Sequence, residues 1–199
     1  APSNAPDMGL NVITLFGEKE QTNHNLSGEF QDYLSWLANS LHNQHDGSGL
    51  GINFSDEESG YLALTPVDLT FNDNTISLDI SIRYPISIHK EQIIKQLEKA
   101  MPNNSIIQVT RDMPSTYFDK NHPMIHQMSK VYEYATGLDG TPVTTTGATY
   151  ARSMPNIIAF GPSFPGQKGI AHNKNEYMDK KDLIKNLEIY TYLLSELGK

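Results

Sequence analysis

Residues 61–84 read YLALTPVDLTFNDNTISLDISIRY, and this stretch decides the fold of the first half of the chain. Two runs rich in apolar and β-branched residues, 61–69 and 75–84, flank the polar triplet 72–74 (Asn-Asp-Asn), which favours a tight turn. Every second residue of the later run is apolar, the period of a strand with one buried face. The apolar set is Ile76, Leu78, Ile80 and Ile82, and the polar set is Ser77, Asp79, Ser81 and Arg83. The stretch therefore predicts an antiparallel β-hairpin.

Helical patterns lie on both sides of this hairpin. Apolar residues recur at helical spacing in 30–41 and in 89–101, and the second of these runs is closed by Pro102. A shorter amphipathic run at 7–17 predicts another helix, and 106–109 predicts a further strand. Helices packed on one face of an antiparallel sheet form an α+β layer. We therefore predict an α+β domain over residues 1–115.

The pattern changes after residue 111. Two helices, a helical turn and two short strands are predicted, at 122–136, 182–197, 149–154, 142–146 and 157–160. Helices that alternate with strands are typical of α/β proteins. We therefore predict that residues 116–199 form an α/β segment.

Composition excludes several classes of protein. The 199 residues contain no cysteine, which excludes a disulfide scaffold, a thiolate zinc site and a cysteine nucleophile. The net charge of −8 argues against a nucleic-acid partner, because phosphate binding needs a basic face. No apolar run is long enough to span a membrane, and the first residues do not resemble a signal peptide. We expect a cytoplasmic protein.

Three features could carry chemistry, and each also has an ordinary structural interpretation. His172 follows a long Gly/Pro-rich loop, where it could be a metal ligand, a general base or a simple surface residue. Arg83 could hold a carboxylate through two parallel hydrogen bonds, or be a solvated strand residue. The small-residue turn at 144–152 (TTTGATYAR) could approach an anion closely, or serve only for tight packing.

Two further clusters are better explained without function. His122 and His126 stand four residues apart on a predicted helix, but no glutamate follows His122, so a helix surface is the better interpretation. The acidic triplet 56–58 (Asp-Glu-Glu) imitates a catalytic acid pair, yet it suits an acidic turn before a strand. The sequence contains no G-x-S-x-G motif and no glycine-rich nucleotide-binding loop.

Taken in order along the chain, the motifs resemble those of zinc-dependent dipeptidases of the PepV type. These enzymes belong to the aminoacylase and glutamate carboxypeptidase group of two-zinc metallopeptidases. The resemblance rests on 6–11 (PDMGLN), 81–85 (SIRYP), 122–125 (HPMI), 147–152 (GATYAR), 160–162 (FGP), 171–177 (AHNKNEY) and 182–183 (DL).

The resemblance implies a lid domain at 1–115, followed by the C-terminal part of the catalytic domain at 116–199. It implies a dipeptide substrate and a pair of zinc ions that activate a bridging water for attack on the peptide carbonyl. His172 matches a metal ligand, and Arg83 matches the lid arginine that holds the C-terminal carboxylate of the substrate. Gly147 and Arg152 match a turn that lines the substrate pocket. No residue of this chain is assigned a catalytic role.

The departures from the family pattern limit what this chain can do alone. The other metal ligands of the family include an H-x-D motif upstream of the lid, and this sequence has no H-x-D. We therefore predict a fragment that supplies one zinc ligand, needs a missing N-terminal catalytic half and is inactive by itself. A homo-oligomer is possible. The alternative is a non-catalytic lid-type module used for dimerisation or peptide binding.

Overall fold

The computed structural model describes residues 3, 5–113, 115–161, 163–167, 170–172 and 174–199. The chain divides into two compact units, Ala1–Pro114 and Ser115–Lys199. Two residues of the quoted motifs, Pro162 and Asn173, lie outside the described residues.

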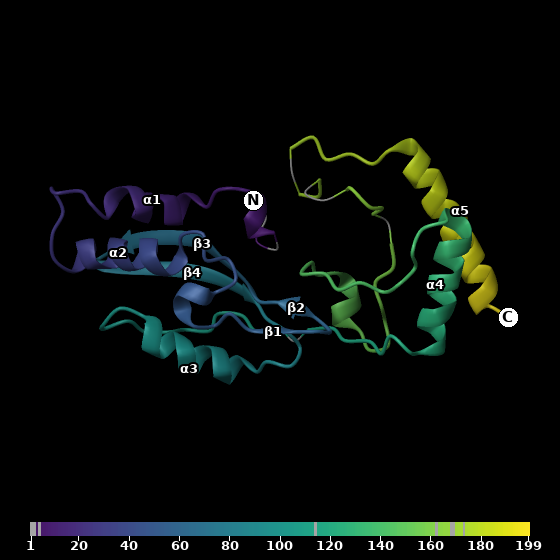
Figure 1. Cartoon of the computed structure of the whole chain (residues 1–199), viewed down its shortest axis with the longest axis horizontal. Helices are drawn as coiled ribbons and strands as arrows, with labels where there is room; N and C mark the ends of the chain where they lie inside the picture. Colours follow the sequence, from purple (N-terminus) through teal and green to yellow (C-terminus); the bar gives the residue numbers. More distant parts are fainter. Residues whose placement is uncertain (1–2, 4, 114, 162, 168–169, 173) are drawn as a thin grey trace. The chain divides into compact units, whose positions relative to one another are not determined.

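The first unit combines helices with two antiparallel strand pairs (Figure 1). Its helices are η1 (Pro6–Met8), α1 (Val12–Glu20), α2 (Glu29–Leu41), η2 (Ser48–Leu50) and α3 (Lys90–Ala100). Its strands are β1 (Ser55–Asp56), β2 (Gly60–Tyr61), β3 (Ala63–Asn72) and β4 (Thr75–Arg83), in which β1 pairs with β2 and β3 with β4.

The hairpin predicted from the sequence is the pair β3–β4. Asp73 and Asn74 both take positive φ angles, of 47° and 61°, as a two-residue turn that matches the twist of its strands requires. The register runs from Ala63 opposite Arg83 to the turn, with an irregularity between Pro66 and Asp68. Since proline has no N–H to donate, an irregular position in a strand with one paired edge accommodates it.

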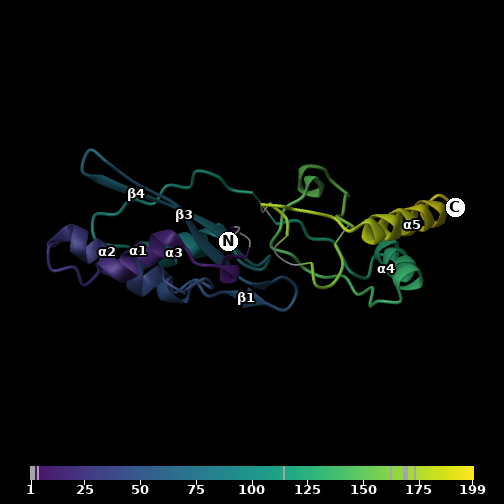
Figure 2. The same ribbon diagram turned by 90° about the horizontal axis from the view of Figure 1, so that it is seen from above.

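One face of this hairpin is covered by α1, α2 and α3 (Figure 2). The alternating apolar residues of β4 face this layer, so the predicted strand period is confirmed. The buried core consists of Leu37, Leu41, Leu50, Ile52, Leu62, Leu64, Ile93 and Leu97. The predicted helices on an antiparallel sheet are therefore observed in the first unit.

The predicted helix at 7–17 is wrong in its continuity. The structure has the short η1, a break at residues 9–11, and then α1. The side chain of Asn11 accepts hydrogen bonds from the N–H groups of Ile13 and Thr14, at 3.0 and 3.2 Å. This side-chain cap starts a new helix at Val12, because it satisfies N–H groups that have no partner within the helix.

The second unit is built around two helices, α4 (Pro123–Thr136) and α5 (Lys180–Leu197), with the short η3 (Tyr150–Ser153) between them in sequence. Local signals set the ends of α4: proline occupies its first turn, and Gly137 ends it in the left-handed conformation. The two long helices pack through Ile125, Met128, Val131, Ile189 and Leu193. This cluster is the buried core of the second unit.

Three predicted strands are absent. The backbone at 106–109, 142–146 and 157–160 is described throughout and joins no sheet. A strand needs a neighbouring backbone for its N–H and C=O groups, and apolar β-branched residues alone do not supply one. Consequently the described part of residues 116–199 contains helices and extended segments, and the α/β pattern predicted there is not formed. The chain as a whole is a mixed α and β protein.

Among the described residues, no helix combines the length and the apolar character that crossing a membrane requires.

Candidate functional site

Arg83 is the last residue of β4, and its position is set by the hairpin. It lies opposite Ala63 in the strand register and is partly buried. Its Nη2 donates a 3.3 Å hydrogen bond to the hydroxyl of Ser3. The next residue, Tyr84, donates to Asp112 at 3.3 Å, and burial together with the Asp112 carboxylate raises the pKa of this phenol.

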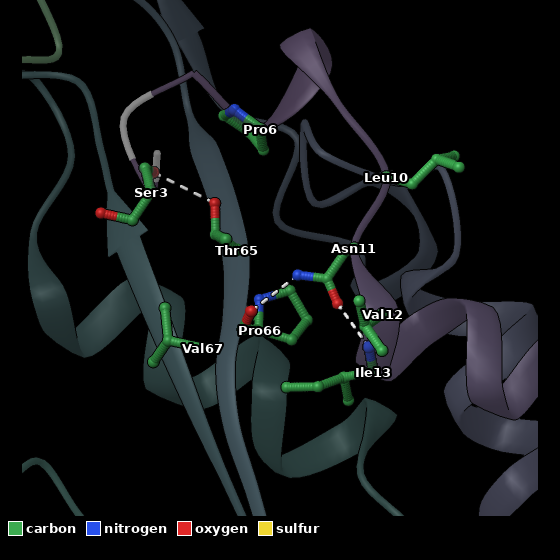
Figure 3. Close-up of a pocket in the computed structure, with 9 residues that line it drawn as sticks. All are labelled: Ser3, Pro6, Leu10, Asn11, Val12, Ile13, Thr65, Pro66 and Val67. Atoms are coloured by element: carbon green, nitrogen blue, oxygen red, sulfur yellow. Dashed lines mark hydrogen bonds between the residues drawn. The ribbon is translucent and has the colours of Figure 1, made fainter. Parts of the chain in front are cut away.

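An open pocket of about 280 Å³ lies on the first unit, and Ser3, the residue that Arg83 contacts, is one of the residues that line it (Figure 3). Ser3 belongs to its wall and accepts a 3.1 Å hydrogen bond from the Thr65 hydroxyl at its carbonyl. On the other side the Asn11 amide donates to the carbonyl of Pro66 at 2.7 Å. The guanidinium therefore contacts Ser3, a residue of the pocket wall, while Arg83 itself is not among the residues that line the pocket.

The sequence interpretation missed Ser3 and Asn11 as parts of this surface. A signal for Asn11 existed, because asparagine before an apolar helical run is a typical helix cap. Ser3 carries no comparable signal, since its contact with Arg83 joins residues 80 positions apart.

Gly147 and Arg152 lie on either side of the start of η3, in the second unit. The N–H of Gly147 donates to the hydroxyl of Thr145 at 3.0 Å, so this N–H already has a partner within the turn. Thr149 caps η3 by accepting the N–H of Ala151 at 3.2 Å, and the partly buried Arg152 follows in the same turn. The turn is thus ordered by its own threonines.

His172 lies on an exposed loop of the second unit. Its φ of 61° is in the left-handed region, and Asn175 repeats this conformation with a φ of 63°. The N–H of His172 donates to Oε2 of Glu176 at 3.0 Å. Non-glycine residues rarely take this conformation, and clusters of them are common at functional sites.

One imidazole on an exposed loop suits a single metal ligand. The described residues contain no group of three or more His, Asp or Glu side chains that could hold a metal ion. A zinc site needs about three or four protein ligands. Among the residues that the structure describes, His172 therefore suits one ligand of a metal site whose other ligands are not grouped around it.

His122 is occupied in a structural role. Its Nδ1 accepts the N–H of Met124 at 3.2 Å, so the imidazole caps α4. Its ring also meets Phe118 edge-on, with the ring centres 5.3 Å apart. The helix-surface interpretation of His122 agrees with this geometry.

The sequence profile of peptidase family M20/M25/M40 matches residues 16–196, which is most of the chain. The chain belongs to this family. The match covers most of the first unit and residues 115–196 of the second, so Arg83 and His172 lie within it, whereas Ser3 and Asn11 of the pocket precede it.

Curated relatives resemble the chain over nearly its whole length. The protein named putative dipeptidase YtjP from Bacillus subtilis (strain 168) is 30% identical over 196 residues, which cover 98% of this chain and 42% of that relative. A putative dipeptidase of Staphylococcus haemolyticus (strain JCSC1435) is 29% identical over 194 residues, which cover 93% of this chain and 40% of the relative. The chain therefore spans about two fifths of the length of these relatives.

Proposed function

We propose that this chain is the lid and C-terminal part of an M20 metallodipeptidase of the PepV type, which hydrolyses dipeptides that carry a free C-terminal carboxylate. The observation that carries this proposal is the guanidinium of Arg83, at the end of β4 and in contact with Ser3 of the pocket wall, within a sequence of the M20 peptidase family. The names of the two relatives support the dipeptidase activity.

Arg83 binds the substrate carboxylate in this proposal. Its planar guanidinium can donate two parallel hydrogen bonds to a carboxylate, and each is stronger than a bond between neutral groups. Its hydrogen bond to Ser3 is long and has a neutral acceptor, so a carboxylate can compete for the same donor. This contact orients one end of the dipeptide. Gly147 and Arg152, which belong to the second unit, are proposed as further substrate-binding residues.

His172 supplies one ligand to a metal centre. The chemistry of bound zinc is to polarise the peptide carbonyl and to lower the pKa of a water molecule. His172 presents a neutral imidazole from a loop that Glu176 closes through the His172 N–H. The other ligands are proposed to come from an N-terminal catalytic half, because the relatives are more than twice as long as the chain's match to them. The chain alone is then inactive.

The test uses the intact peptidase that contains this chain and two substrates, a free dipeptide and the same dipeptide with a C-terminal amide. Replacing Arg83→Ala removes a charged hydrogen bond to the carboxylate of the free dipeptide only. We expect kcat/KM for the free dipeptide to fall about 30- to 150-fold, mostly through a higher KM. This corresponds to a loss of about 2–3 kcal/mol of transition-state stabilisation. The amide should be hydrolysed nearly as before.

An unchanged kcat/KM for the free dipeptide would remove Arg83 from the site. Absence of dipeptide hydrolysis by the intact wild-type protein, after loading with zinc, would reject the proposed activity as a whole.

A further inference from the structure

In the acidic turn at residues 56–58, each carboxylate oxygen of Asp56 accepts two hydrogen bonds. One oxygen of Asp56, Oδ1, accepts the backbone N–H of Ser59 at 2.5 Å and the Ser59 hydroxyl at 2.7 Å. The other oxygen, Oδ2, accepts the N–H of Ser87 at 3.2 Å and the Ser87 hydroxyl at 2.7 Å. Hydrogen bonds from Ser87 and Ser59 hold the pKa of this carboxyl well below its usual range. Asp56 is therefore ionised at neutral pH and joins two segments 31 residues apart.

The segment that Asp56 holds follows directly after Arg83. Ser87 lies four residues beyond Arg83, and the buried Pro85 lies between them. Proline fixes its own φ, which leaves little backbone freedom in this short connection. In addition, the N–H of Ile86 donates to the hydroxyl of Ser59 at 2.9 Å. Two consecutive residues after Pro85 are thus bonded to the turn between β1 and β2.

The turn between β1 and β2 is also connected to Arg83 through the strand that follows it. The chain leaves β2 at Tyr61 and begins β3 at Ala63, which lies opposite Arg83 in the sheet. Strand pairing therefore fixes the backbone at Arg83, while Asp56 and Ser59 fix the backbone just beyond it. Residues 59–63 and 83–86 are thus linked at both ends, by the strand pair Ala63–Arg83 and by the hydrogen bond from the Ile86 N–H to the Ser59 hydroxyl. The backbone that carries the Arg83 side chain is therefore held on both sides.

We propose that Asp56 is a positioning residue for Arg83, which acts by holding the chain after β4 so that the guanidinium meets the substrate carboxylate. The inference rests on the function proposed above for Arg83. Asp56 itself touches neither substrate nor metal in this account. This role gives a function to Asp56, one residue of the acidic triplet 56–58 that is not part of a catalytic acid pair.

The test compares Asp56→Asn with Glu57→Gln in the intact peptidase. Both changes remove one negative charge from the same turn, but Glu57 is an exposed neighbour that takes no part in the hydrogen bonds of Asp56 with Ser59 and Ser87. We expect Asp56→Asn to raise KM for a free dipeptide by about three- to tenfold, the effect of weakened hydrogen bonding, with kcat near the wild-type value. Glu57→Gln should leave both constants unchanged.

Two further readouts separate positioning from a general structural role. Hydrolysis of the C-terminal amide should be unaffected by Asp56→Asn, because this substrate has no carboxylate for Arg83 to hold. The double variant of Asp56→Asn with Arg83→Ala should be no worse than Arg83→Ala alone, since both changes act on one contact. If Asp56→Asn does not fold, Ser87→Ala carries the same test, and Ser87→Thr should restore the wild-type KM by keeping the hydroxyl.

The proposal is overturned if the KM of the free dipeptide stays at the wild-type value, or if the amide loses as much activity as the free dipeptide. Arg83→Ala distinguishes the two levels of the account. If Arg83→Ala impairs hydrolysis of the free dipeptide and Asp56→Asn does not, the positioning role fails alone. If Arg83→Ala itself has no effect, the proposed function of Arg83 fails as well.

Discussion

Replacing Leu41→Ala tests whether the first unit is an independently stabilised domain. Leu41 lies at the end of α2 with 0% of its surface exposed, in the core cluster of the first unit. The change deletes buried carbon atoms and leaves a cavity, which costs about 3 kcal/mol, within the range of about 2–5 kcal/mol for such sites. Each kcal/mol shifts the melting temperature of a domain of this size by about 4–8 °C, so a fall of more than about 10 °C is expected.

Differential scanning calorimetry of the 199-residue chain is the assay. The two hydrophobic clusters draw their residues from opposite sides of the division at 114/115, so two transitions are expected. Leu41→Ala should lower one transition, and Met128→Ala, in the second cluster, should lower the other. Leu10→Ala is the matched control, because Leu10 is 70% exposed. A single transition that both core variants lower equally would refute the independence of the units.

Alkaline pH and glycine replacement give two further predictions for the first unit. Burial raises the pKa of Tyr33 from 10.0 to about 12. The neutral phenol therefore contributes its full stabilisation below pH 10, and this contribution is lost as the pH rises through about 12. The free energy of unfolding, measured with urea, should consequently fall less at alkaline pH in Tyr33→Phe than in the wild type. A Cβ at Gly49 would overlap the backbone carbonyl of Ser40, so Gly49→Ala should destabilise the unit by about 1–3 kcal/mol in the same assay. Gly51→Ala meets no atom within 4 Å but keeps a φ of 67°, so its cost reports backbone strain without overlap; a Gly49→Ala variant as stable as the wild type would contradict the steric explanation.

Local patterns predicted the parts of the fold that depend on short stretches of chain. The hairpin β3–β4 follows from alternation and from a turn whose residues tolerate positive φ. The helices α2, α3, α4 and α5 follow from apolar spacing and from their end signals. The segments 106–109, 142–146 and 157–160 have strand composition, but their state depends on a neighbour that the segment itself does not specify.

The candidate site was predictable only at the level of single residues. Arg83 and His172 stood out by residue type and by place, at the end of a predicted strand and on a glycine-rich loop. Their surroundings involve contacts between residues distant in sequence, such as Arg83 with Ser3 and Ser87 with Asp56. Such contacts depend on tertiary packing, so the interpretation of residues 56–58 as an acidic turn before a strand does not include the hydrogen bonds of Asp56 to Ser87.

In the function proposed above, this chain supplies one ligand, His172, to a metal centre completed elsewhere in an M20 dipeptidase. The most direct test of this central claim measures bound zinc and dipeptide hydrolysis for the 199-residue chain, for the intact protein and for the intact His172→Ala variant. We expect zinc and hydrolysis in the intact wild type, a loss of both in His172→Ala, and neither in the chain alone. Hydrolysis of a dipeptide by the chain alone, or full zinc content in His172→Ala, would contradict the account.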